Sequence, residues 1–198
     1  MRAAWFVIAL AFALSGCEQP GSTPRATAPS NLVVVRDFTI SASTRVVVDT
    51  SFGFNLNRGQ PGVPLAQRGA GLARAAAFNI ADALTEQLRQ LGYDAVHAHR
   101  DTPDPAGRAL IVTGTLSEVN EGHRRQVGDE HAKVAADAEI DEWTPGIRPA
   151  LALHLDSDAL AGDNAEDSAA VAGAARRVGR ELARRVAEIA RKDGFTPK

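Results

Sequence analysis

The spacing of apolar residues changes several times along the chain and divides it into segments with the period of a strand or of a helix. β-Branched apolar runs at residues 32–40 and 109–119 predict strands, and residues 45–50 form a further strand or an extension of the first. Residues 133–142 alternate apolar with polar positions, and leucines recur at every second position from 151 to 155. The Thr144-Pro145-Gly146 turn between them predicts a hairpin, and residues 93–99 a further strand.

Two segments have the helical period of 3.6 residues. In residues 72–91 the apolar positions share one helix face, and Gly92 is placed to end the helix. Residues 165–193 carry a second apolar stripe, with Asp163 and Glu166 in capping-box spacing at its start and Gly194 after it. Residues 52–71 contain five glycines and two prolines, which predicts no regular structure there.

The order of these elements, with strands grouped between two helices, predicts an α+β fold. We expect a mostly antiparallel sheet of four to five strands, with both helices packed on one face and the other face open to solvent. Bulky apolar residues are modest in number, because the chain has 37 alanines. They suffice for one core, so residues 32–198 are expected to form a single domain.

The first 31 residues have a different composition. Residues 3–14 are an apolar run of 12 residues after Met1-Arg2, shorter than the roughly 20 that span a bilayer and typical of a signal peptide. Leu14-Ser15-Gly16-Cys17 then resembles a bacterial lipobox, in which the cysteine thiol receives a diacylglyceryl group. We expect a signal peptide at residues 1–16, and an acylated Cys17 with a proline-rich disordered tether at residues 17–31. The alternatives are an ordinary signal peptide with a chance cysteine, or a buried strand.

Charge and cysteine content exclude several classes of protein. The chain has 22 Lys and Arg against 24 Asp and Glu, a net charge of −2, which argues against a nucleic-acid partner. Its one cysteine allows neither an intrachain disulfide nor a cysteine-based zinc cluster. No Gly-x-Ser-x-Gly elbow or phosphate-binding loop is found, so we expect neither an enzyme nor a cofactor.

Two sets of side chains are candidates for binding. His97 and His99 would project from one face of a strand, and with His123 and His131 they could hold zinc or copper. Exposed histidines without a metal are the commoner case, and we expect no metal. The last helix carries basic residues that either form a solvated face with pairs such as Glu181–Arg185 or touch an anionic surface. The candidates for that contact are Arg177, Arg180, Arg184 and Arg191.

Several short motifs together resemble an uncharacterised family of bacterial lipoproteins with a domain of unknown function. They are Val35-Arg36-Asp37-Phe38, Asp49 to Ser51, Leu88 to Tyr93, and Val112 to Gly122. The resemblance implies a fold similar to the small domains of transport-auxiliary and curli-secretion lipoproteins, and it brings no catalytic residues.

The expected function is that of a lipid-anchored lipoprotein that acts by binding. The residue after the cysteine is Glu18. By resemblance to Gram-negative lipoproteins, an Asp at this position would favour the inner membrane. Its absence implies the outer membrane, facing the periplasm. There it would be an accessory subunit in envelope assembly or transport, with the membrane and an envelope protein as partners. The alternatives are a ligand- or metal-binding lipoprotein and, more distantly, a periplasmic hydrolase.

Overall fold

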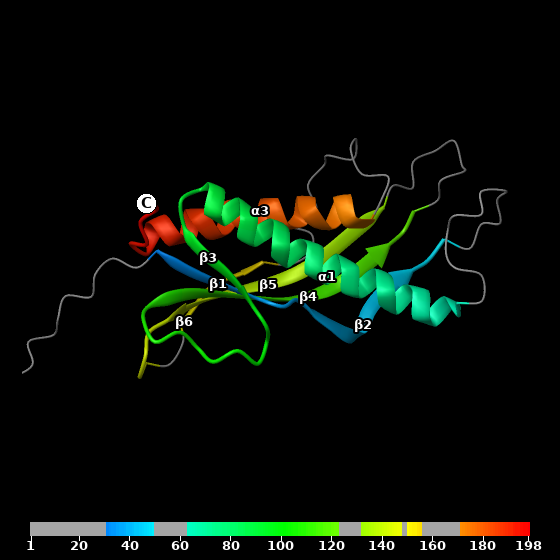
Figure 1. The fold of residues 1–198 in the computed structure, drawn as a ribbon, viewed down its shortest axis with the longest axis horizontal. Coiled ribbons are helices and arrows are strands. Elements are labelled where there is room, and N and C mark those ends of the chain that lie inside the picture. Colours follow the sequence, from blue (N-terminus) through cyan, green and yellow to red (C-terminus); the bar gives the residue numbers. More distant parts are fainter. Residues whose placement is uncertain (1–30, 50–62, 123–131, 148–149, 156–170) are drawn as a thin grey trace, which may run out of the picture.

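One sheet with two helices on one of its faces makes up the described part of the chain (Figure 1). The computed structural model describes residues 31–49, 63–122, 132–147, 150–155 and 171–198, the segment 150–155 by its backbone alone. The helices are α1 (Leu65–Gln90) and α3 (Val171–Lys192). The strands are β1 (Leu32–Arg36), β2 (Thr39–Val47), β3 (Asp94–Ala98), β4 (Ala109–Asn120), β5 (Lys133–Trp143) and β6 (Ala150–Leu155).

The sheet is mixed, so the expectation of a mostly antiparallel sheet is wrong. Its strands run in the order β3-β1-β4-β5-β6, and β2 follows β1 along the same edge of β4. β1 pairs in parallel with β3 and with β4, and β2 pairs in parallel with β4. Only β4 with β5 and β5 with β6 are antiparallel, the latter pair being the predicted hairpin. The α+β class and the two helices on one face are confirmed.

The parallel pairs arise from two crossover connections. Parallel neighbours cannot be joined by a tight turn. α1 supplies the crossover from β2 to β3, and residues 99–108 supply the second, from β3 past β1 to β4, without a helix. A run of strands without a helix between them is typical of hairpins, which is why the sequence pattern predicted antiparallel pairing.

The first predicted strand, residues 32–40, is divided into β1 and β2 at Asp37 and Phe38. Phe38 is buried with its ring against Gly114 of β4, where the Cβ of any other residue would overlap the ring. Gly114 thus allows the close approach of this ring, a common reason for a glycine inside a strand. The division raises the number of strands to six and leaves Asp37 at the carboxyl end of β1.

α1 begins seven residues before the predicted start, so the prediction of irregular structure is wrong for residues 65–71. The buried Gly69 lies under β2, and a Cβ there would be 3.3 Å from Cγ1 of Val46. Close packing against β2 thus outweighs the poor helix propensity of glycine. The predicted end is confirmed: Gly92 has a φ of 89°, and the amide of Tyr93 donates to the carbonyl of Leu88. Residues 50–62 lie outside the described residues.

The high alanine content allows α1 and α3 to approach each other closely. At their contact, a Cβ on Gly179 would lie 2.5 Å from the carbonyl oxygen of Ile80 and 3.1 Å from Cβ of Ala83. Many alanines of the two helices are buried: Ala76, Ala77, Ala81, Ala83, Ala174, Ala175, Ala183 and Ala187.

α3 closes the core and ends as predicted, at Lys192 before Gly194, which has a φ of 76°. Leu182 in the middle of its apolar stripe and Phe195 just after the helix are fully buried. The predicted capping residues Asp163 and Glu166 lie outside the described residues. In the part of the chain that the structure describes, neither helix combines the length and the apolarity needed to cross a membrane.

Candidate functional site

The second crossover, residues 99–108, covers one end of the sheet face that lies opposite the helices (Figure 1). Beneath it is a small apolar cluster separate from the main core. The indole Nε1 of Trp143, at the end of β5, donates to the carbonyl of Pro105 at 2.9 Å. The cluster consists of Val34, Ala98, Ala109 and Ile111, with Leu32 and Trp143 packed against it.

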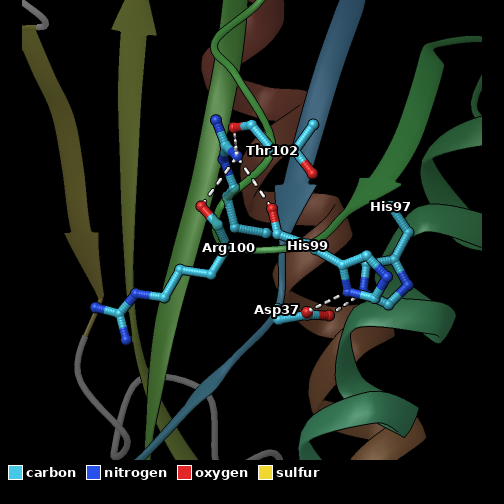
Figure 2. A network of polar contacts seen from close by, with 6 residues as sticks. Asp37, His97, His99, Arg100 and Thr102 are labelled. Atoms are coloured by element: carbon cyan, nitrogen blue, oxygen red, sulfur yellow. Dashed lines mark hydrogen bonds and ion pairs between the residues drawn. The ribbon is translucent and has the colours of Figure 1, made fainter.

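Arg36 fixes this crossover from below. Its side chain points to the same face as that of Val34, and the residue is only 6% exposed. Nη1 donates to the carbonyls of His99 at 3.1 Å, of Arg100 at 3.2 Å and of Thr102 (Figure 2). Nη2 forms an ion pair with Asp104 at 2.8 Å. A loop lacks the ladder that satisfies backbone carbonyls in a strand, and one guanidinium with five donors replaces it here.

The next residue along the chain, Asp37, binds two histidines. Its carboxylate accepts from Nε2 of His97 at 2.8 Å and from Nδ1 of His99 at 2.9 Å, and Figure 2 shows both rings beside it. His97 is in β3 and His99 follows the strand, so the spacing of two residues brings both rings to the same carboxylate. The ring of His97 also lies 5.9 Å from that of Phe78 in α1. We call Asp37, His97 and His99 the histidine–aspartate cluster.

The electrostatics of the cluster favour an ionised Asp37. Partial burial by itself raises the pKa of this carboxyl group, whereas the hydrogen bonds from His99 and His97 and the charge on their rings lower it. The lowering effects prevail, and the pKa of Asp37 lies below its ordinary value. The carboxylate is therefore charged at neutral pH and acts as a fixed acceptor for both rings.

The exposure of the cluster indicates a contact on the protein surface that joins two segments, and it does not indicate an enclosed active site. The side chains of His97, Asp37 and His99 are 23%, 41% and 92% exposed, so solvent reaches the whole group. Acid–base chemistry usually requires a buried pair with separated pKa values. Within the described ranges, no group of three or more His, Cys, Asp or Glu side chains is arranged to hold a metal ion. The cluster joins the start of the crossover to β1.

The remaining residues singled out in the sequence lie apart from this cluster. Cys17, His123 and His131 lie outside the described residues. Arg180, Arg184 and Arg191 are exposed on α3, and Arg177 is half-buried, with Nη1 shielded from solvent and without a hydrogen-bond partner among the described residues. The predicted pair of Glu181 with Arg185 is confirmed at 3.5 Å.

Arg36 and Asp37 were missed as site residues by the reasoning from sequence. Arg36 carried a signal, because it is a charged residue inside a run of apolar strand positions. Asp37 carried the same signal, but the sequence did not indicate its partners. They are 60 and 62 residues further along the chain, and only the parallel pairing of β1 with β3 brings them together.

Comparisons with known proteins give little. A scan against protein-family models finds no match, and a search of curated proteins finds none either. Among solved structures, the chain is similar to protein XCC0632 from Xanthomonas campestris, assigned to the family DUF330. The two are 13% identical with a TM-score of 0.35, over 88% of this chain and 93% of that one. The assignment to a family of unknown function is that of the Xanthomonas protein. The resemblance of this chain to a lipoprotein family stays a prediction.

Proposed function

We propose that the protein is a lipid-anchored lipoprotein of the outer membrane that faces the periplasm and acts by binding, as an accessory subunit in envelope assembly or transport. The observation that carries the proposal is the sequence Leu14-Ser15-Gly16-Cys17, in which the sole cysteine of the chain follows an apolar run of signal-peptide length. Acyl chains on Cys17 would provide stable attachment, because each buried CH₂ contributes about 0.8 kcal/mol.

The position of the folded domain in the chain supports this proposal. The first strand, β1, begins at Leu32, immediately after the proline-rich residues 17–31. Among the described residues, the core is made by side chains from Val33 to Phe195, which agrees with a folded domain that begins at β1. Polar groups on the sheet face opposite the helices hold the second crossover, residues 99–108, in place. A surface segment fixed in this way is consistent with a rigid module that acts by binding.

Replacing Cys17 tests the anchor. Cys17→Ser should leave the chain uncleaved and without lipid, and mass spectrometry of the N-terminal peptide of the wild type should find an acylated Cys17. A matched control is the double variant C17S/S22C, which restores a cysteine five residues away from the lipobox position. We expect no acylation of this control. An unmodified Cys17 in the wild type, or an acylated Cys at position 22 of the control, would refute the anchor.

The accessory role is tested separately by chemical cross-linking in intact envelopes. The wild-type chain should be recovered with the same envelope complex in repeated preparations, and the C17S/S22C control should lose most of that association because it lacks the anchor. Equal recovery of wild type and control would contradict an anchored accessory subunit.

A further inference from the structure

The outer surface of α3 carries an unbalanced positive charge. From residue 176 onward it exposes six basic side chains: Arg176, Arg180, Arg184, Arg185, Arg191 and Lys192. Only two acidic residues, Glu181 and Glu188, are interleaved, and Glu181 is shared between Arg184 and Arg185. Among the described residues, Arg180 and Arg191 have no carboxylate partner.

Three of these residues form a line. Arg180, Arg184 and Arg191 are spaced by four and seven residues, which places them on one side of the helix, away from the buried Leu182 and Val186. We call these three residues the arginine stripe. The polar face has no role in the core, so its charge is available for a partner.

The composition around the stripe indicates the kind of partner. The large exposed apolar side chains of the described residues lie elsewhere: Ile40 in β2, Leu65 and Phe78 in α1, Val96 in β3, and Ile147 in a turn. Stable protein interfaces usually have an apolar or aromatic centre. A headgroup surface needs only charge, because Lys and Arg within a Debye length of about 8–10 Å are attracted to it.

We propose that the arginine stripe docks the domain on the anionic headgroups of the bilayer in which the acyl chains of Cys17 are anchored. This inference rests on the proposed lipid anchor and adds the orientation of the domain: α3 faces the membrane, and the opposite face of the sheet, with the crossover, faces the periplasm. Without apolar side chains in the stripe, the contact is superficial and sensitive to salt.

Weak attraction is sufficient because the domain is tethered. Each basic residue near an anionic surface raises partitioning about fivefold. If the 14 residues from Glu18 to Asn31 form the proposed flexible tether, its r.m.s. length is about 20 Å. That length corresponds to an effective concentration in the millimolar range. The anchored domain therefore docks through a surface that would bind poorly when free.

The test uses the full lipidated chain reconstituted in vesicles of phosphatidylcholine alone or with phosphatidylglycerol. Acylation occupies the thiol of Cys17, so an introduced cysteine can be labelled uniquely with a fluorophore. Energy transfer to headgroup-labelled lipid is compared for Ala172→Cys, at the start of α3, and Ala42→Cys, in β2. Both positions are exposed and lie away from the end of the domain where the tether joins β1 (Figure 1).

Docking through the stripe predicts stronger transfer from position 172 than from position 42 in anionic vesicles. The difference should disappear in neutral vesicles and at high salt. R180E/R184E should abolish the difference in energy transfer between the two positions, and R180Q/R184Q should reduce that difference at least tenfold. Circular dichroism and acylation should be unchanged in both variants. The matched control R45E/R100E makes the same change in net charge away from α3 and should retain the difference.

Several outcomes would overturn the inference. The first is an equal loss of the difference in energy transfer in the R45E/R100E control. The second is a difference in transfer that persists in neutral vesicles, and the third is the absence of any such difference in every vesicle. If the difference appears only when envelope proteins are added, the stripe binds an acidic protein and not lipid. Failure of the anchor is distinguishable, because it shows as an unmodified Cys17 in the mass spectrum, whatever the energy transfer reports.

Discussion

The two faces of the sheet are covered in different ways. On one face, α1 and α3 pack on a largely apolar layer that includes Val33, Val35 and Leu110. A helix satisfies the backbone hydrogen bonds of its interior residues by itself, so its contact with the sheet can be mainly apolar. On the other face, residues 99–108 cover a separate apolar cluster with few members, and the backbone carbonyls of this loop require donors. Arg36 supplies these donors from within the sheet.

β1 provides for both faces at once. Its side chains alternate, so that Val33 and Val35 join the core under the helices while Val34 and Arg36 point to the crossover. The backbone of the covering segment therefore decides which side chain must lie beneath it. A regular helix is matched by valine, and an irregular loop by a charged residue with several donors.

The largest effect is expected on the helix face. Leu182 is fully buried in the middle of α3. Leu182→Ala removes buried methyl groups and leaves a cavity, which should lower the free energy of unfolding by about 2–5 kcal/mol in urea denaturation. The exposed Glu188→Ala on the same helix should stay within about 0.5 kcal/mol. If Leu182→Ala leaves the free energy of unfolding unchanged, apolar packing contributes little to this face.

A smaller and more local effect is expected on the other face. Arg36→Met keeps the length of the side chain but leaves the carbonyls of residues 99, 100 and 102 without their donor. Unmet hydrogen bonds of this kind lower stability by about 1–3 kcal/mol. Hydrogen exchange should increase in residues 99–104, while α1 and α3 keep their protection.

The matched control for Arg36 is Arg100→Met. Arg100 is exposed and its side chain donates only to Oγ1 of Thr39 among the interactions seen here, at 3.1 Å. Its replacement should change neither exchange nor stability by a measurable amount. If Arg36→Met loses protection from hydrogen exchange equally on both faces, the two layers unfold together. The contrast between the two faces would then not hold.

The fold was predictable where local patterns decide it. The alternation in β5 placed Val134, Ala136, Ala138 and Ile140 on the core side, and all four are buried. The sheet topology was not predictable in this way, because parallel pairing depends on which strands become neighbours. The crossover from β3 to β4 contains no helix whose sequence pattern would indicate it. Gly69 predicts a break in α1, and only its contact with Val46 explains why a glycine lies inside this helix.

The candidate site shows the same distinction between local sequence patterns and contacts that depend on the sheet topology. The spacing of His97 and His99 is a local pattern and identified them as neighbours. Asp37, their common partner, depends on β1 lying beside β3, and Arg36 depends on the path of a loop more than 60 residues away. Contacts that require a specific topology are therefore the part that a single sequence does not provide.

The smallest effects concern one carboxylate on each side of the sheet. Asp37 binds His97, whose ring lies against Phe78 of α1, and the pKa of Asp37 is lowered. An acid with a lowered pKa stabilises the fold above its unfolded pKa of about 3.9, and this contribution is lost as the pH falls through its folded pKa. Asp37→Asn should thus lower stability at pH 7 by at most about 1 kcal/mol, because the group is partly exposed. The difference from wild type should vanish in urea denaturations taken well below pH 4.

Asp141 in β5, which alternates with the buried Ile140 and so lies on the other side, is the control of opposite sign. Burial, and then the negative charge of Glu139, raise the pKa of Asp141. Ionisation of such a group costs stability above its folded pKa, and the cost disappears as the pH falls through that value toward 3.9. Asp141→Asn should therefore be slightly more stable than wild type at pH 7 and equal to it near pH 3. If Asp37→Asn is instead as stable as wild type at pH 7 or more stable, the charge of Asp37 is not matched by the two histidines. The histidine–aspartate cluster would then hold the crossover by packing alone.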